Sequence, residues 1–74
     1  MQVQVLDALG LKGPQPVVKI ALTTPSMKLG DILEVWGDCP TFERDVRIWC
    51  ERLGKTLLSV AEDGGGKKII QIKF

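Results

Sequence analysis

The spacing of apolar residues changes from alternation to helical periodicity within the first third of the chain. In residues 1–6, Val3 and Val5 share one face and glutamines the other, which is typical of a half-buried strand with its valines toward the core. After Pro14, which suits a first helical turn, the residues at helical spacing are Val17, Ile20, Ala21 and Thr24. We therefore expect a strand followed by a helix that Pro25 helps to end.

A second strand and a second helix are predicted in the middle of the chain. Residues 31–36 alternate so that Leu33 and Val35 face the core. The following helix begins near Pro40 and ends before Gly54, because glycine is favoured just after a helix C-terminus. Its apolar stripe consists of Phe42, Val46, Trp49, Cys50 and Leu53.

The last third of the chain has the pattern of a β-hairpin, with strands over residues 56–62 and 67–74. Apolar residues of both strands are expected to pair over the core: Leu58, Val60, Ile70, Ile72 and Phe74. Right-handed crossovers in the order βαβαββ place both helices on one face of a mixed four-stranded sheet. We predict one domain over residues 1–74, an α/β (α+β) two-layer sandwich.

Composition narrows the class of function. The chain has 45% hydrophobic and 26% charged residues, and its net charge of +1 is scattered, which is typical of a globular domain without a polyanion-binding field. No apolar stretch approaches the ~20 residues that span a bilayer, and the N-terminus does not resemble a signal peptide. We expect a cytoplasmic protein without membrane contact. With two cysteines and no histidine, neither a metal site nor a Cys39–Cys50 disulfide is expected.

Two segments carry a resemblance to a known family. They read LDALGLKGPQPV at residues 6–17 and LGDILEVWGDCPTFERDVRIWCERLGKTLL at residues 29–58. Together they resemble the TusA (SirA-like) sulfur-carrier family, whose hallmark is a Leu-Asp-x-x-Gly-Leu run that leads to Cys-Pro-x-Pro. The resemblance covers essentially the whole chain and implies a sulfur-relay carrier. Such a protein accepts persulfide sulfur from a donor, such as a cysteine desulfurase or a rhodanese-like protein, and passes it to an acceptor protein. No cofactor is implied.

The chain departs from this family at the central residue of the motif. Where the resemblance implies the acceptor cysteine, the sequence has Gly13, which has no nucleophilic side chain. The resemblance therefore does not decide whether this chain is an enzyme that transfers sulfur. Supporting residues of the motif are present: Asp7, Gly10, Lys12, Pro14 and Pro16. We expect the Asp7 carboxylate to bond backbone N–H groups of the turn that follows it. Three explanations remain for position 13: a cysteine replaced by design, a natural member without relay activity, or transfer of the role to another thiol.

Cys39 is the candidate substitute thiol. It precedes Pro40 at the start of the second helix, where backbone N–H groups stabilise a thiolate, although Asp38 beside it has the opposite effect. The alternative is an unreactive cysteine in a turn. Cys50 and Trp49 lie on the apolar stripe of the helix and are interpreted as core residues.

Two functions compete at this point. The first is the sulfur relay. The second is a non-catalytic protein-binding or regulatory module on the same fold, which would use Lys12, Lys19 and an open-face apolar patch made of Trp36, Ile32, Leu57 and Ile69. Nucleic-acid binding is suggested only by the likeness of this sandwich to the C-terminal domain of a translation initiation factor. The net charge of +1 and the lack of a basic stripe oppose it.

Overall fold

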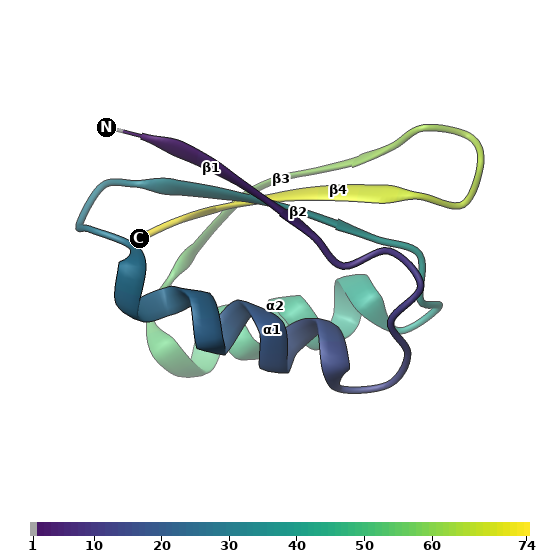
Figure 1. Cartoon of the computed structure of the whole chain (residues 1–74), viewed down its shortest axis with the longest axis horizontal. Helices are drawn as coiled ribbons and strands as arrows, with labels where there is room; N and C mark the ends of the chain where they lie inside the picture. Colours follow the sequence, from purple (N-terminus) through teal and green to yellow (C-terminus); the bar gives the residue numbers. More distant parts are fainter. Residues whose placement is uncertain (1) are drawn as a thin grey trace.

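The computed structural model describes residues 2–74 as two layers, a four-stranded sheet and two helices that cover one of its faces (Figure 1). The strands are β1 (Val3–Asp7), β2 (Ile32–Gly37), β3 (Thr56–Glu62) and β4 (Lys68–Lys73). The helices are α1 (Gln15–Thr23) and α2 (Phe42–Leu53), with a 3-10 turn, η1 (Thr24–Ser26), after α1. The predicted fold class is confirmed. Met1, part of the predicted first strand, lies outside the described residues.

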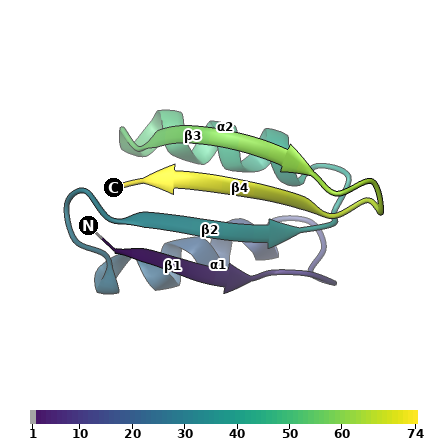
Figure 2. The ribbon, with the colours of Figure 1, turned by 90° about the horizontal axis from the view of Figure 1, so that it is seen from above.

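The sheet is mixed and has the strand order β1-β2-β4-β3 (Figure 2). β1 and β2 run parallel, whereas β4 runs antiparallel to both of its neighbours. Because the carboxyl ends of parallel neighbours meet at one edge of a sheet, the loops that follow β1 and β2 emerge side by side. These loops contain position 13 and Cys39.

Val3 and Val5 lie on the open face of the sheet, so the face predicted for them was wrong. The register pairs Leu6 with Val35, which is fully buried under the helices. Val3 and Val5 therefore point away from the helices and are 58% and 50% exposed. The core contacts of this segment come instead from Leu6 and from Ala8, one residue beyond the strand.

The core fills the space between the sheet and the helices. Its most buried hydrophobic residues are Ala8, Ile20, Leu33, Val35, Phe42, Val46, Ile70 and Ile72. Leu33 and Val35 are completely buried, as predicted. At the start of α2, the ring of Phe42 packs on Gly37 so closely that a Cβ atom at this glycine would lie 2.7 Å from the ring. The absence of a side chain at Gly37 lets the helix approach the strand.

An irregularity in β3 changes which leucine reaches the core. The strand has a register shift between Leu57 and Ser59, and a bulge of this kind interrupts the alternation of faces. Leu57 pairs with Ile72 and packs against the core, whereas Leu58 is 44% exposed. The core prediction for Leu58 was therefore wrong, and so was the assignment of Leu57 to the open-face patch around Trp36.

The open face of the sheet is partly covered by polar side chains around Trp36. The Lys67 ammonium lies 4.1 Å from the centroid of the Trp36 ring, and the indole Nε1 donates to Glu34 at 2.9 Å. Gln71 donates to the other oxygen of the same carboxylate at 3.0 Å. These contacts leave less free apolar surface here than the sequence predicted.

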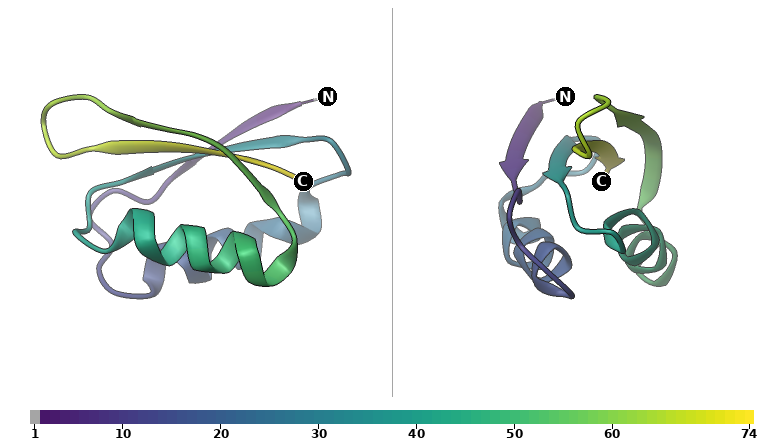
Figure 3. Two further views of the ribbon diagram at one scale, coloured as in Figure 1. Left: turned by 180° about the vertical axis from the view of Figure 1, so that it is seen from behind. Right: turned by 90° about the vertical axis from the view of Figure 1, so that its right-hand side faces the viewer.

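Both helices lie beneath the same face of the sheet (Figure 3). α2 ends as predicted at Gly54, whose φ of 69° is left-handed and favours glycine. An ion pair one helical turn apart, between Glu43 and Arg47, is present in this helix at 3.0 Å. Leu53 is 54% exposed, so its place in the buried stripe was wrong.

Candidate functional site

The loops that follow β1 and β2 are tied to each other at one end of the sheet. Oδ1 of Asp38 accepts a hydrogen bond from the backbone N–H of Gly10 at 3.1 Å, across 28 positions of sequence. The Asp7 carboxylate accepts the backbone N–H of Leu9 at 3.0 Å, the turn contact expected from the sequence. Lys19 of α1 adds a 2.6 Å bond from Nζ to the Asp7 carbonyl. Both loops are thereby held in one arrangement.

Gly13 lies at the exposed end of the first loop, immediately before the α1 N-terminus. Its φ of 59° is in the left-handed region, and a Cβ atom built there would meet nothing within 4 Å. A cysteine in this conformation would point into open space but would carry the backbone strain that glycine avoids. Pro14 is the N-cap residue of α1 and Pro16 is buried in its first turn, so the helix start is rigid.

Cys39 lies in the second loop, directly against the first. Its residue surface is 8% exposed, so the side chain is largely enclosed. Hydrogen bonding to the side chain and backbone of Thr41 lowers the pKa of the Cys39 thiol, and the backbone N–H of Gly13 and the charge of Lys12 act in the same direction, while burial opposes them. The structure thus brings together two positions that are far apart in the sequence.

The hydroxyl of Thr41 is shared between Cys39 and a carboxylate. Oγ1 of Thr41 donates to Oδ2 of Asp45 at 2.9 Å and lies 3.5 Å from Sγ of Cys39. Since a hydroxyl has one hydrogen and an ionised carboxylate can only accept, the neutral thiol must be the donor toward Thr41. When Cys39 loses its proton, the Thr41 hydroxyl can stabilise the thiolate only by turning away from Asp45.

The second cysteine has the opposite environment. Cys50 is 3% exposed within the core, and burial raises the pKa of its thiol. The prediction that it is a core residue is confirmed. Both cysteines are free thiols. Trp49, also predicted as core, packs against the core but is only half-buried, because one side of its ring faces a pocket between the helices.

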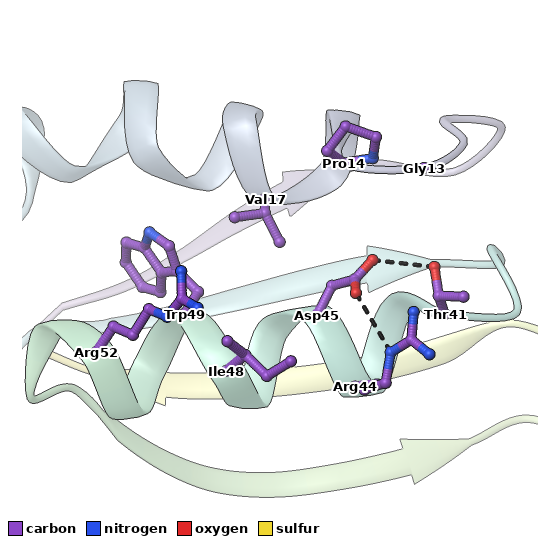
Figure 4. Close-up of a pocket in the computed structure, with 9 residues that line it drawn as sticks. All are labelled: Gly13, Pro14, Val17, Thr41, Arg44, Asp45, Ile48, Trp49 and Arg52. Atoms are coloured by element: carbon purple, nitrogen blue, oxygen red, sulfur yellow. Dashed lines mark hydrogen bonds and ion pairs between the residues drawn. The ribbon is translucent and has the colours of Figure 1, made fainter.

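This pocket, which we call the interhelical groove, has a volume of about 540 Å³ (Figure 4). Its lining comes from the N-terminal part of α1 and from the length of α2: Gly13, Pro14, Val17, Thr41, Arg44, Asp45, Ile48, Trp49 and Arg52. In Figure 4, Val17 points from α1 toward the side chains of α2. One end of the groove is at Gly13 and Thr41, the two residues that also contact Cys39.

Two negative results concern residues 2–74. Within this range no three His, Cys, Asp or Glu side chains are grouped so that they could hold a metal ion. Neither helix has the length and apolar character needed to cross a membrane.

Comparison with known proteins identifies the class. The chain belongs to the TusA family: a family model described as "Sulfurtransferase TusA" matches residues 4–73. It is also 41% identical over 68 residues to a protein of Aquifex aeolicus (strain VF5) that is named "Putative sulfur carrier protein". The match covers 92% of this chain and 34% of that relative, so the chain spans about a third of the relative's length.

The sequence singled out Gly13 and Cys39 separately, and the structure places them in contact. Nothing in the sequence connected Thr41 or Asp45 with the thiol of Cys39. The available signal was the spacing of Cys39, Thr41 and Asp45 around the start of α2, where residues four apart lie on one face. The interhelical groove could not be predicted, because it depends on how far apart two helices are held by the sheet.

Proposed function

We propose that this chain works as a sulfur-relay carrier in which Cys39, and not residue 13, holds the transferred sulfur. One observation carries the proposal: the Cys39 thiol lies close to the backbone N–H of Gly13, beside the position where the family motif has its cysteine. Membership of the TusA family and the likeness to a sulfur carrier support a role of this kind. The motif residues around Gly13 then serve as the frame of the thiol site.

The chemistry needs a thiolate and a donor persulfide. The Cys39 thiolate attacks the terminal sulfur of a donor R–S–SH, the donor S–S bond breaks, and a new S–S bond forms on Cys39. The donor leaves as a thiolate, the proton stays on the terminal sulfur, and no net oxidation occurs. Thr41, and after it the backbone N–H of Gly13 and the charge of Lys12, favour the thiolate that begins this step.

The reaction requires protein partners, a sulfur donor and a downstream acceptor, and calls for no cofactor. A cysteine desulfurase or a rhodanese-like protein is a suitable class of donor. The cytoplasmic location expected from the sequence stays a prediction.

Intact-mass spectrometry with peptide mapping tests the assignment. The chain and its Cys39→Ser and Cys50→Ser variants are each incubated with a persulfide donor. We expect one added sulfur atom on Cys39 in the chain and in Cys50→Ser, and none in Cys39→Ser. An adduct on Cys50, or none on the chain itself while Gly13→Cys gains one, would overturn the assignment. A Gly13→Cys variant is the positive control, because it restores the thiol that the family motif contains.

A second function is favoured by the enclosure of Cys39. A thiol in a residue only 8% exposed is poorly accessible to a donor, and the open interhelical groove beside it suits a non-catalytic protein-binding module. The same experiment separates the two functions. If Gly13→Cys gains sulfur and the chain itself does not, the fold is competent, the relay thiol is absent, and the binding module is the better description.

A further inference from the structure

One end of the interhelical groove adjoins the thiol site, because Gly13 and Thr41 line the groove and also lie next to Cys39. It begins at Gly13 and Thr41 and follows α2 as far as Arg52. Thr41 and Arg52 are separated by eleven residues of helix, about 16 Å at the usual helical rise. An extended peptide covers this distance with about five residues.

The floor of the groove is apolar and partly open to solvent. Val17, Ile48 and Trp49 supply most of it. Ile48 is 42% exposed, because the groove that it faces is open to solvent. Apolar floors of this kind take up one or two apolar side chains of a ligand, because their burial removes hydrocarbon surface from water.

The charges around the groove are mainly positive. Arg44, whose side chain is 70% exposed, lies near the thiol end and makes only a 3.6 Å contact with Asp45. Arg52 lies at the far end and has no ion-pair partner among residues 2–74. Lys12 adds a further positive charge beside Cys39. A ligand with carboxylates near both ends would complement this arrangement.

We propose that the interhelical groove binds an extended segment of a partner protein in which apolar side chains are flanked by acidic ones. Bound in this way, the segment brings its own cysteine to the thiol end of the groove, beside Cys39. This inference rests on the proposed relay for the identity of the partner, which is a donor or acceptor of sulfur. The binding itself depends only on the groove.

A capped pentapeptide with glutamate at each end and three central leucines is the probe. Its titration into the ¹⁵N-labelled chain is followed by NMR up to millimolar concentration. We expect the backbone signals of Val17, Arg44, Ile48 and Arg52 and the indole signal of Trp49 to shift together. Two control peptides, with lysine in place of glutamate or serine in place of leucine, are expected to bind at least about fivefold more weakly.

Charge reversal on α2 provides the matched comparison. Arg52→Glu and Arg44→Glu should each weaken binding of the acidic probe by about fivefold or more. Arg47→Glu should not, since Arg47 lies on the same helix, pairs with Glu43 and is not part of the groove. The NMR spectrum of each variant also shows whether the fold is intact.

The inference would be overturned by no shifts from the acidic probe, by equal affinity for the acidic and basic probes, or by shifts on the open face of the sheet. Shifts that follow protein concentration without peptide would assign the groove to a second copy of the chain and also overturn it. The probe contains no sulfur, so peptide binding can succeed while the sulfur adduct on Cys39 fails, and the two proposals are tested separately.

Discussion

The thiol of Cys39 and the carboxylate of Asp45 depend on one hydroxyl group, that of Thr41. Oγ1 lies 2.9 Å from Oδ2 of Asp45 and 3.5 Å from Sγ of Cys39. Asp45 belongs to the groove lining, whereas Cys39 is not one of the lining residues. The acid strength of the thiol is therefore linked to a residue that a bound partner can reach.

The first prediction concerns this link. Asp45→Ala frees the Thr41 hydroxyl to donate to sulfur and removes a negative charge, so the pKa of Cys39 should fall further. Alkylation of Cys39 by iodoacetamide at neutral pH should become several-fold faster. Thr41→Val should have the opposite effect, because Thr41 is the main cause of the lowered pKa of this thiol.

Combining the two substitutions isolates the hydroxyl. In the Thr41→Val background, Asp45→Ala can act only through its charge, so its effect on the alkylation rate should be clearly smaller. The buried Cys50 is an internal reference, since burial raises the pKa of its thiol and keeps it slow. If Asp45→Ala changed the alkylation rate of Cys39 by the same factor in both backgrounds, Thr41 would not connect the Asp45 carboxylate with the Cys39 thiol.

The second prediction concerns the backbone at position 13. Gly13→Ala should destabilise the chain by about 1–2 kcal/mol, because an L-residue is strained at a φ of 59° while its Cβ meets no neighbour. Gly65→Ala is the matched control: its φ is outside the left-handed region, and its Cβ would make an ordinary 3.5 Å contact with Asp63. Urea unfolding measures both. A neutral or stabilising Gly13→Ala would contradict the left-handed conformation.

The third prediction concerns the contact between β2 and α2. Gly37→Ala should destabilise the fold by about 1–3 kcal/mol, because the new methyl group would overlap the Phe42 ring at 2.7 Å. Phe42→Leu also destabilises the chain by emptying core volume. Together the two should cost less than the sum of the single changes, as judged from urea midpoints. Strict additivity would mean that the residues do not compete for the same space.

Periodicity was sufficient to predict the order of the elements but not every face. The alternation of Val3 and Val5 was recognised, yet an edge strand with polar residues on its inner side gives no local sign of which face is covered. The Leu57 and Leu58 assignments were exchanged because a bulge shifts the alternation, and a bulge is a property of strand pairing.

The candidate site was predicted in its parts and not in its arrangement. Helix-start chemistry drew attention to Cys39, and the family motif drew attention to Gly13. Their contact follows from the parallel pairing of β1 and β2, which the bond between Asp38 and Gly10 reinforces. The groove and the shared Thr41 hydroxyl depend on the spacing and rotation of the helices, for which the sequence has no direct signal.

The fourth prediction concerns acid stability. Hydrogen bonds from Trp36 and Gln71 lower the pKa of Glu34 below its ordinary value of 4.5. The backbone N–H of Lys28, and with it that of Gln2, lowers the pKa of Asp31 below 3.8. A carboxyl group with a lower pKa in the folded chain stabilises the fold fully above its ordinary value, and this contribution is lost as the pH falls through the folded-state value.

The free energy of unfolding should therefore be level from neutral pH to about 4.5, the ordinary value for Glu34, and should decrease below it. Glu34→Gln should flatten the upper part of this decrease and Asp31→Asn the lower part, as urea midpoints at successive pH values would show. Glu51→Gln is the control, because Glu51 is exposed and has no side-chain hydrogen bond within residues 2–74. If Glu51→Gln flattened the curve as much as Glu34→Gln, the acid sensitivity would reflect overall charge, and the open-face network around Trp36 would not be its source.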